Sequence, residues 1–387
     1  MKLEGISSVI FVVNHLAFFV SHRLPIALSL IEKGVIVRLI VGQPGSATME
    51  AIAQKDIEAL DIPYDRLNFT SDGMNIFKEF GAVIALIRLL RSHDNALLHC
   101  VSPKGVLYGG VAGRICGVKR VVFAISGMGF IATESKEGGL KRSVLKNVYS
   151  LVLRFIVRSK RARVIVQNAY DEAVMQKMAG RGLENVRLIK GSGVNCSQYD
   201  HARPFGSRKT VLFPARLLKD KGVVEFVKAA EIVKSKHPTW RFVLAGALDY
   251  SNPSAIDIAM FQSEIDKGVI ECLGHVEDMV ALYADASIVC LPSYREGLPK
   301  VLIEAAASSC AVITTNTIGC RDAVLPGITG EVVPVRDHIS LSVSIENLID
   351  NPLKREAYGR AGKEFAEAEF SLSGVIQQTF EIYHELI

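Results

Sequence analysis

Four charged residues form the pattern in this chain that is best suited to chemistry. Arg216 and Lys221 lie five residues apart, directly after an apolar stretch at residues 210–213 that reads as a buried strand. Two cations in a strand-to-helix loop can hold a diphosphate from two sides, because a guanidinium and an ammonium both make charge-assisted hydrogen bonds to phosphate oxygens. A solvated basic turn explains the same two residues, and for this segment alone it is the simpler interpretation.

The other two charged residues, Glu296 and Glu304, flank a predicted helix start. Glu296 follows the predicted strand at residues 287–291, and Glu304 falls about a turn and a half into the helix. Gly297 allows backbone N–H groups to approach an anion or a sugar at the positive end of the helix dipole, and Pro299 suits the first helical turn. Glu304 can then bond ribose hydroxyls. A capped helix with one solvated glutamate is an alternative of equal weight.

Together these two segments resemble the second domain of the glycosyltransferase family 4 enzymes. The family pattern R-x4-K-G is followed about 75 residues later by E-G-x-P-x4-E, and both patterns stand in this sequence. The segments Gly274-His275-Val276 and Gly319-Cys320-Arg321-Asp322 also fit the family. The resemblance covers essentially the whole chain and is most specific in residues 210–330.

The family resemblance implies a role for each residue of the motif. Arg216 and Lys221 would hold the donor diphosphate and stabilise the leaving group, and Glu296 would act with them as the third catalytic residue. The donor-binding set that the resemblance implies is Arg216, Lys221, His275, Val276, Glu296, Gly297, Leu298, Pro299 and Glu304. In this set, Glu296 with the amides of Gly297 and Leu298 takes the sugar, Glu304 takes the ribose, and the loop of His275 and Val276 lies by the base.

The first half of the chain resembles a narrower branch, the capsule, O-antigen and N-glycan enzymes that extend sugars on polyprenyl diphosphate. The segments that carry this resemblance are residues 18–25, 102–105 and 127–130. It implies that acceptor phosphates meet four residues, namely His22, Arg23, Lys104 and Gly127. From the residues alone, Ser21 is a candidate N-cap, and His22, Arg23 and Lys104 belong in loops after strands. Ser126 precedes Gly127 where many family members carry histidine, so a catalytic role for that histidine does not transfer.

The motifs that are missing bear on mechanism. No two aspartates stand two apart, so the D-x-D metal motif is missing, and no nucleotide-binding glycine fingerprint or phosphate loop is present. We therefore expect no required metal or other cofactor, with Arg216, Lys221 and helix N-termini meeting the leaving-group charge. The family implies a retaining reaction, in which the acceptor hydroxyl attacks from the front face. The branch implies a UDP-sugar donor carrying an N-acetylhexosamine.

These loops must be positioned by an alternation of short apolar stretches and helical patterns. Strands are expected at residues 9–13, 35–41, 96–100, 120–124, 164–167 and 186–189, and then at 210–213, 241–245, 269–273, 287–291 and 311–314. Such alternation predicts an α/β fold with parallel sheets covered on both faces, and it happens twice. We expect two doubly wound Rossmann-like domains of GT-B type, at residues 1–193 for the acceptor and 194–370 for the nucleotide-sugar. A last helix at 371–387 would pack back on the first domain.

The charge distribution separates the two halves of the chain. Residues 1–195 carry a net charge of +11 and residues 196–387 a net charge of −6. The sequence lacks a signal-peptide pattern or a long apolar segment, and its seven cysteines are scattered, so we expect a cytoplasmic protein. Residues 141–163 hold eight basic residues and no acidic one. With Val144, Val148, Leu151, Val152 and Phe155 on another face, this stretch predicts an element that binds an anionic membrane surface through Arg142, Lys146, Arg154 and Arg158. The alternative is that the apolar face is ordinary domain core and the charges are solvated.

Three other functions compete with a membrane-peripheral glycosyltransferase. A non-hydrolysing sugar-nucleotide epimerase has the same two-domain fold but is expected to lack the paired cations and carboxylates. A two-lobed sugar-binding protein would need an export signal. A nucleic-acid binder would use the basic half, but the sequence has a single tryptophan and little aromatic interleaving. A glycosyltransferase with a soluble acceptor also remains open.

Overall fold

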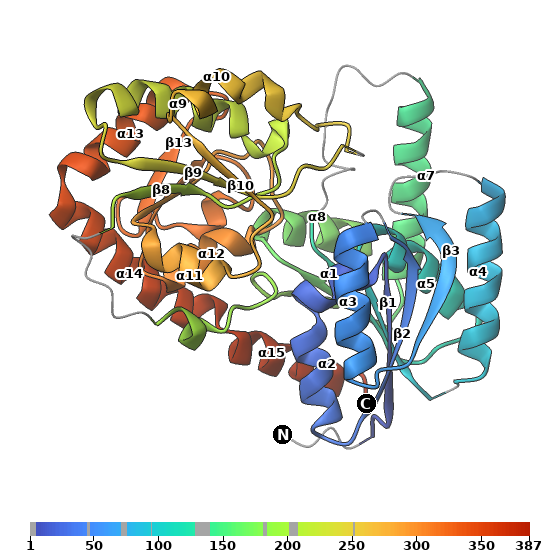
Figure 1. The fold of residues 1–387 in the computed structure, drawn as a ribbon. Coiled ribbons are helices and arrows are strands. Elements are labelled where there is room, and N and C mark those ends of the chain that lie inside the picture. Colours follow the sequence, from blue (N-terminus) through green and yellow to red (C-terminus); the bar gives the residue numbers. More distant parts are fainter. Residues whose placement is uncertain are drawn as a thin grey trace. The chain divides into compact units, whose positions relative to one another are not determined.

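The computed structural model describes residues 5–44, 47–70, 76–93, 95–127, 140–180, 184–200, 208–250 and 252–387. The chain forms two compact units (Figure 1). The first unit combines Met1–Ser192 with Val375–Ile387, and the second is Gly193–Gly374. The last thirteen residues therefore belong to the same unit as the N-terminus.

The first unit is built on a parallel sheet with strand order β3-β2-β1-β4-β5-β6-β7 among the described residues. Its strands are β1 (Ser8–Val13), β2 (Ile36–Gln43), β3 (Tyr64–Thr70), β4 (Leu97–Val101), β5 (Val121–Ile125), β6 (Ala162–Val166) and β7 (Val186–Leu188). All five residues of β4 and of β5 are buried. A sheet buried on both faces explains why these strands read as continuous apolar stretches.

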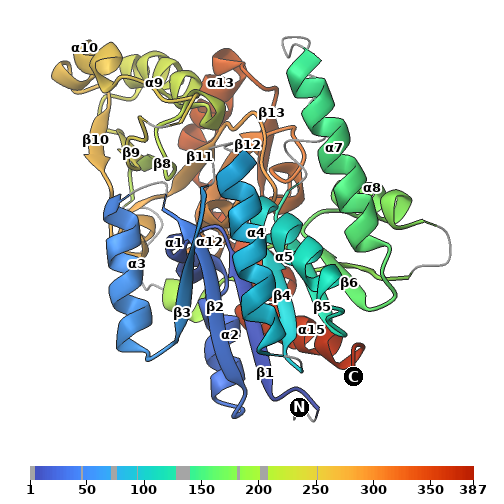
Figure 2. The same ribbon diagram turned by 90° about the vertical axis from the view of Figure 1, so that its right-hand side faces the viewer.

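Helices cover both faces of this sheet (Figure 2). One core cluster lies under α1 (Leu16–His22), α2 (Leu24–Ile31), α3 (Ala47–Ala59) and α15 (Leu372–His384). The other lies under α4 (Ile76–Arg91), α5 (Pro103–Ile115), α7 (Leu140–Val157) and α8 (Ala169–Ala179). Helix α15 brings Val375, Phe380 and Tyr383 into the first cluster, so the end of the chain completes the core that the start of the chain begins.

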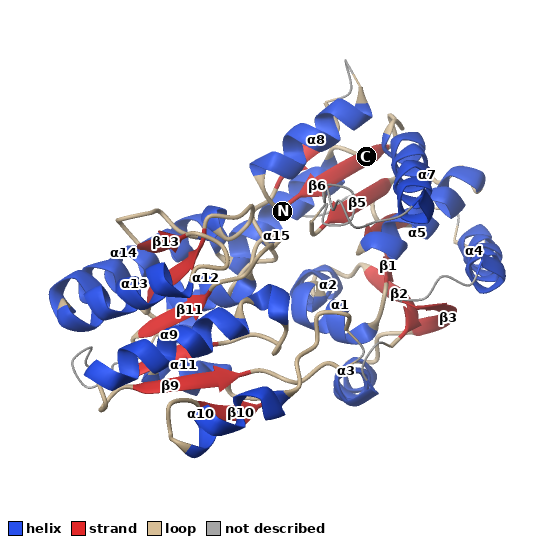
Figure 3. Cartoon of the chain, turned by 90° about the horizontal axis from the view of Figure 1, so that it is seen from above, coloured by secondary structure: helices blue, strands red, loops and turns tan. Residues whose placement is uncertain are grey.

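The second unit repeats this architecture with strand order β10-β9-β8-β11-β12-β13. Its strands are β8 (Thr210–Phe213), β9 (Arg241–Ala245), β10 (Glu271–Gly274), β11 (Ile288–Leu291), β12 (Ala311–Thr315) and β13 (Gly330–Val333). Its α-helices are α9 (Val223–Lys236), α10 (Gln262–Asp266), α11 (Met279–Asp285), α12 (Lys300–Ala307), α13 (His338–Asp350) and α14 (Pro352–Phe370). Helix α9 packs beside α13, and α12 packs beside α14. Figure 3 distinguishes the strands of each unit from the helices that cover them.

Every strand pair in both sheets is parallel. The two sheets therefore confirm the predicted α/β class with two doubly wound units. In such sheets the loops at the carboxyl ends of the strands form the binding edge. The predicted site residues have to be sought there.

The prediction of Ser21 as a helix N-cap is wrong. The chain is helical from Leu16, and α1 and α2 are separated by Arg23. His15, not Ser21, is the N-cap of α1, because its side chain accepts the N–H of Phe18. Ser21 lies inside α1, and its hydroxyl donates to the carbonyl of Ala17. A serine hydroxyl can satisfy a carbonyl one turn earlier, so serine alone does not mark a helix start.

Candidate active site

The loop between β8 and α9 has little conformational freedom. Residues Lys219–Lys221 form a short 3-10 turn (η3), and Gly222 follows it with a φ of 79°. A Cβ atom on Gly222 would lie 2.1 Å from the carbonyl oxygen of Pro292. Only glycine fits both the left-handed backbone and this contact, so the glycine of the R-x4-K-G pattern brings the Lys221 turn against the end of β11.

Lys221 meets Glu296 at this edge. Its Nζ donates to Glu296 Oε1 at 2.5 Å, and the Ser293 hydroxyl donates to the same oxygen at 2.9 Å. The Ser293 hydroxyl is also within 3.0 Å of the Asp220 carbonyl oxygen, which ties the two loops together. Glu296 is largely buried, with 13% of its side chain exposed, so its carboxylate is stabilised by this pair and not by bulk water.

The loop after β12 packs against the backbone of Glu296. Gly319 has a φ of 80°, and a Cβ atom there would lie 2.2 Å from the carbonyl oxygen of Gly297 and 2.6 Å from that of Glu296. The Gly319 amide donates to the Asp322 side chain at 3.0 Å, which closes its own turn. The backbone that presents Glu296 and Gly297 is therefore packed against a second loop of the same unit.

Arg216, the other predicted cation, has a carboxylate partner of its own. Its Nη1 donates to Asp249 Oδ2 at 2.7 Å, and Asp249 lies in the loop that follows β9. This loop is joined to the segment after Arg216 by two backbone hydrogen bonds, from Leu217 to Ala247 and from Lys219 to Ser254. Asp249 therefore lies on a supported loop, while 54% of the Arg216 side chain is exposed.

Glu304 is held in the second turn of α12. Lys300 Nζ lies 3.2 Å from its Oε1, and the Tyr283 hydroxyl donates to its Oε2 at 3.3 Å. Burial and the nearby Glu304 carboxylate raise the pKa of Tyr283 well above its ordinary value, so Tyr283 keeps its proton and remains a donor. Glu304 is itself buried. One of its carboxylate oxygens faces Lys300 of the same helix, and the other faces Tyr283 of α11.

Most of the other residues predicted for the donor site lie at the start of α12. Gly297 and Leu298 are half-buried, Pro299 is buried, and among the described residues no side chain caps the helix. The first amides of an uncapped helix, with its dipole, favour an anion. Pro299 is the N-cap and not the first helical residue. His275 is exposed and Val276 packs against the core, just after Gly274 ends β10.

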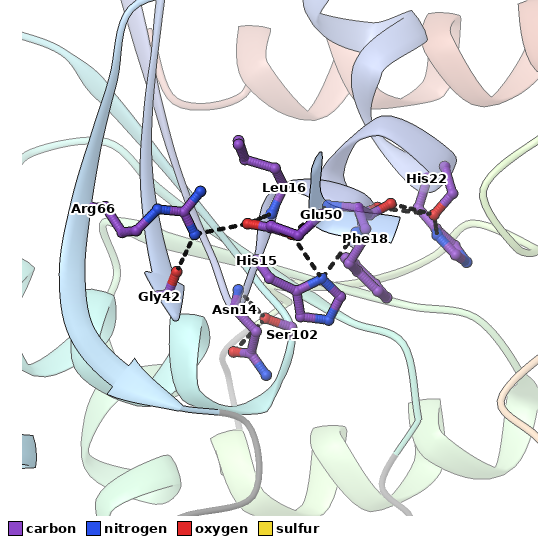
Figure 4. A network of polar contacts seen from close by, with 11 residues as sticks. Asn14, His15, Leu16, Phe18, His22, Gly42, Glu50, Arg66 and Ser102 are labelled. Carbon is purple, nitrogen blue, oxygen red and sulfur yellow. Dashed lines mark hydrogen bonds and ion pairs between the residues drawn. The ribbon is translucent and has the colours of Figure 1, made fainter. Parts of the chain in front are cut away.

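The carboxyl edge of the first sheet carries a different network (Figure 4). Glu50 of α3 is buried and accepts the amides of Leu16 and Ala17 at 3.2 and 3.1 Å. Arg66 Nη1 donates to the same carboxylate at 2.7 Å. Glu50 thus places a negative charge at the N-terminus of α1, and Arg66 compensates that charge.

Asn14 joins the ends of β1 and β4. Its side-chain oxygen accepts from the Ser102 hydroxyl at 2.7 Å and from the Gly105 backbone N–H at 3.3 Å, while the Asn14 backbone N–H donates to the Ser102 hydroxyl oxygen at 3.0 Å. Ser102 has a φ of 68°, which is unusual for a residue other than glycine. This network fixes the start of α5, where the predicted acceptor residue Lys104 lies.

Two predicted acceptor residues lie in positions that the sequence did not anticipate. His22 is the last residue of α1, not a loop residue, and its ring stacks on Phe18 with centroids 4.4 Å apart. Arg23 is buried, and its Nη1 donates to the His22 carbonyl at 2.9 Å. Burial lowers the pKa of Arg23 to about 10. Arg23 therefore has a structural role, because its guanidinium stabilises the junction of α1 and α2.

The other two acceptor residues follow β4 and β5. Lys104 is in the first turn of α5, not in a loop, and its Nζ donates to Glu79 of α4 at 2.6 Å. Gly127 is the last described residue after β5 and has a φ of 150°. The rest of its motif, residues 128–130, lies outside the described residues, as do the side chains of Arg142 and Lys146.

The structure thus joins Lys221 to Glu296, but it pairs Arg216 with Asp249. Sequence reasoning missed Asp249, Ser293, Lys300 and Tyr283. Asp249 and Ser293 each follow a predicted buried strand, and that position was a usable signal. Lys300 stands four residues before Glu304, the spacing of helical ion pairs. Nothing local marks Tyr283, because it reaches Glu304 from another helix.

Two kinds of feature are absent from the described part of the chain. In those residues, no group of three or more His, Cys, Asp or Glu side chains is placed to hold a metal ion. No helix among them is both long enough and apolar enough to cross a membrane.

Both halves of the sequence match families of known proteins. Residues 200–365 match the family described as glycosyl transferases group 1, and residues 8–167 match the family described as glycosyl transferase 4-like. Both halves of the chain are glycosyltransferase domains. The match over residues 200–365 spans most of the second unit, including Arg216, Lys221, Glu296 and Glu304.

Curated relatives of this glycosyltransferase include enzymes of surface polysaccharide assembly. The capsular polysaccharide biosynthesis glycosyltransferase CapM of Staphylococcus aureus is 23% identical over 319 residues, which is 81% of this chain and 82% of that protein. An N,N'-diacetylbacillosaminyl-diphospho-undecaprenol alpha-1,3-N-acetylgalactosaminyltransferase of Campylobacter jejuni is 24% identical over 334 residues, 82% of this chain and 85% of that protein.

Solved structures share the whole fold. The Anabaena protein Alr3699/HepE, crystallised in complex with UDP, superposes with a TM-score of 0.76, covers 98% of this chain and is itself covered completely, at 16% identity. At that identity the match establishes the fold. This glycosyltransferase has the GT-B fold, as the sequence predicted.

Proposed function

We propose that this glycosyltransferase transfers an N-acetylhexosamine from a UDP-sugar to a saccharide on polyprenyl diphosphate, with retention of anomeric configuration. One observation carries the donor half of the proposal. Lys221 and Glu296, a cation and a carboxylate from two loops, meet at 2.5 Å beside the uncapped start of α12. A diphosphate is an anion, so it can bind both the N-terminal amides of α12 and the Lys221 ammonium. A sugar hydroxyl can then replace Lys221 as the donor to Glu296.

In the proposed reaction the donor replaces the internal ion pairs. The diphosphate takes Arg216 from Asp249 and Lys221 from Glu296, and both cations then stabilise the charge that develops on the leaving phosphate. Glu296, released from Lys221, accepts hydroxyls of the donor sugar together with the amides of Gly297 and Leu298. Glu304 accepts the ribose hydroxyls, and the His275–Val276 loop lies by the base.

The bond change is a substitution at the anomeric carbon. The acceptor hydroxyl attacks the face from which UDP departs, so the new glycosidic bond forms where the old bond breaks. The hydroxyl proton passes to the departing phosphate oxygen. Retaining glycosidases place two carboxylates about 5 Å apart around the bond. Glu296 and Glu304 have binding partners of their own here and are not assigned as nucleophiles.

The acceptor half of the proposal rests on the first domain and on the relatives. The C. jejuni relative is named for a diphospho-undecaprenol-linked acceptor. We place the acceptor phosphates near Lys104, His22, Arg23 and Gly127. Lys104 must exchange Glu79 for the phosphate, and Arg23 holds His22 in place through its carbonyl. A polyprenyl acceptor stays in the bilayer, so the enzyme works as a peripheral protein on the cytoplasmic face of the membrane.

One reconstitution tests this function. Purified enzyme is incubated with UDP-sugars and synthetic saccharides on either polyprenyl diphosphate or a water-soluble alkyl group, in the presence and absence of EDTA. We expect transfer from a UDP-N-acetylhexosamine to the diphosphate acceptor, α-linked product by NMR, and unchanged rate in EDTA. Transfer that requires the soluble acceptor overturns the lipid assignment. Interconversion of UDP-sugars without transfer supports the epimerase, and activity that magnesium restores overturns metal independence.

A further inference from the structure

Helix α7 exposes apolar side chains along one face. Val148, Leu151 and Phe155 are 52%, 69% and 57% exposed, and their spacing of three and four residues places them in one row. The core side of the helix is formed by other residues, Leu153 and Ile156, which are at most 1% exposed. The exposed row is therefore additional to the face that packs on the sheet.

The end of α5 extends this row. Ile115, the last residue of α5, is 58% exposed. The preceding residue, Arg114, lies with its guanidinium carbon 4.8 Å from the centre of the Phe155 ring, and its Nη2 donates to the Phe155 carbonyl at 2.9 Å. The two helices pack closely, since a Cβ atom on Gly110 would lie 2.6 Å from Ile156 Cδ1. The exposed residues of α5 and α7 thus belong to one rigid surface.

The charge around this surface has a single sign. Described residues 95–127 and 140–170 contain twelve lysines and arginines and no aspartate or glutamate. Arg114 and Arg154 are exposed beside the apolar row, and Lys119, Lys160 and Arg161 belong to the same acid-free stretches. An apolar row bordered by cations matches the anionic headgroups and acyl chains at a membrane surface.

The direction of α7 links this surface to the acceptor edge. Strand β5 ends at the carboxyl edge of the sheet and β6 begins at the opposite edge, so the intervening helix runs antiparallel to the strands (Figure 2). The first turn of α7 is therefore at the edge that carries Ser102 and Lys104. A helix of 18 residues is about 27 Å long, so a lipid surface along α7 reaches from one edge of the sheet to the other.

The geometry points to a membrane-docking face made of Ile115, Val148, Leu151 and Phe155 with Arg114 and Arg154. The apolar row enters the headgroup layer of an anionic bilayer, and the arginines contact lipid phosphates. This inference rests on the proposed function for its purpose, which is to bring the carboxyl edge of the first sheet to a lipid-linked acceptor. The bilayer is the occupant, because only a fluid anionic layer offers both headgroups and apolar chains over such a length.

The structure shows which basic residues can be substituted to test the docking face. Arg158 follows the end of α7, and its Nε donates to the Met178 carbonyl at 3.1 Å, in the last turn of α8. Replacing Arg158 would therefore disturb a helix terminus as well as a surface charge. Arg154 and the apolar row are exposed and can be changed without removing a hydrogen bond that the structure shows.

Vesicle sedimentation without any sugar substrate tests the docking face. The full chain is mixed with phosphatidylcholine vesicles containing 30% phosphatidylglycerol or none. The variants are Leu151→Ser/Phe155→Ser and Arg154→Ser. Matched controls are Ile339→Ser/Val343→Ser, two exposed apolar residues on α13, and Lys228→Ser, an exposed cation on α9. Melting temperatures and UDP-induced thermal shifts check that each variant is folded.

We expect the wild-type chain to sediment with anionic vesicles at low salt and to be released at high salt. The double variant on α7 should bind at least tenfold more weakly and Arg154→Ser about threefold more weakly, while both controls bind like wild type. Equal losses in the α13 control, unchanged binding by the α7 double variant, or no wild-type binding would each overturn the docking face. Because no acceptor is present, failure of the proposed reaction leaves this result interpretable.

A fluorescence measurement gives a second, independent result. The only tryptophan of the chain, Trp240, is 6% exposed and lies in the second unit. A Leu151→Trp variant therefore adds one exposed reporter to a constant background. Its emission should shift to the blue with anionic vesicles and stay unchanged with neutral ones. An unshifted emission in the fraction that sediments would mean that another surface docks, and would overturn the inference.

Discussion

The carboxyl edges of the two sheets differ in how they satisfy the helix N-termini beside the candidate site residues. In the first unit, Glu50 accepts two amides at the start of α1, and the Asn14 side chain accepts an amide at the start of α5. In the second unit, Asp278 caps α11 and Asp337 caps α13, but among the described residues no side chain caps α12 or α9. The first edge therefore contains its own electronegative groups, whereas the second leaves helix amides for an anion that comes from outside. The comparison supports the proposal that the donor diphosphate binds the second unit.

The largest expected effect tests the cations of the second edge. Replacing Arg216 or Lys221 with alanine should cost about 2–4 kcal/mol of transition-state stabilisation, because each removes a charge-assisted contact to the leaving group. Donor kcat/KM should fall roughly 30- to 1000-fold. Lys219→Ala, an exposed lysine of the same turn, is the matched control. A variant of either cation with wild-type kcat/KM would show that the diphosphate binds elsewhere.

The built-in carboxylate of the first edge should matter for folding and not for the donor. Glu50→Ala leaves the α1 amides and Arg66 without their acceptor, so the free energy of unfolding should fall by about 2–3 kcal/mol. Affinity for UDP, measured by calorimetry, should stay within a factor of two. Glu58→Ala, an exposed glutamate of α3, serves as control. A strong loss of UDP affinity in folded Glu50→Ala would contradict the contrast between the two edges.

Glu304 and Glu296 should separate nucleoside binding from sugar binding. Glu304→Ala should weaken UDP about tenfold, or about 1.4 kcal/mol, because the ribose loses a carboxylate acceptor. Glu296→Ala should leave UDP affinity nearly intact and lower turnover, since it removes a sugar contact and frees Lys221 for the diphosphate. Calorimetry on UDP and rates with the UDP-sugar check both. The reverse order of effects would refute the assignment.

The smallest effect concerns Asp249. Its carboxylate pairs with Arg216, so under the proposed function it competes with the diphosphate for that cation. Exposed pairs contribute roughly 0.2–1 kcal/mol, and Asp249→Asn should therefore tighten UDP binding up to about fivefold. Asp266→Asn, another exposed aspartate of this unit, should have no effect. Weaker UDP binding in Asp249→Asn would show that Asp249 supports the site instead of competing for it.

The sequence predicted all the strands inside the two sheets and missed one edge strand of each sheet. The predicted stretch at 210–213 coincides with β8, and that at 241–245 with β9. Strand β3 was missed, because it includes Asp65, Arg66 and Asn68 and shows no continuous apolar stretch. Strand β13 was missed because it begins with Gly330 and Glu331 and shows no continuous apolar stretch. Both lie at the edges of their sheets, where one side lacks a neighbour and burial constrains the sequence less.

The candidate site was predicted by residue type but not by partner. Local spacing identified Lys221 and Glu296, whose contact the structure shows, yet Asp249 and Tyr283 approach from elements that no local pattern connects to the motifs. In the first unit the error was conformational. His22 and Arg23 were placed in a loop, whereas packing of Leu16 and Phe19 in the core extends α1 as far as His22. Burial then directs Arg23 inward.

The final helix affects how the molecule can be made. His99 Nδ1 and the Tyr383 hydroxyl are 2.5 Å apart in space but 284 residues apart in the chain. Arg163 and Arg187 both bond Glu385, close to the end of the chain. During synthesis the second unit leaves the ribosome while the first still lacks these partners. The unit that is synthesised first is therefore the last to be completed. A product truncated before Val375 would expose apolar core residues of the first unit to chaperones and proteases.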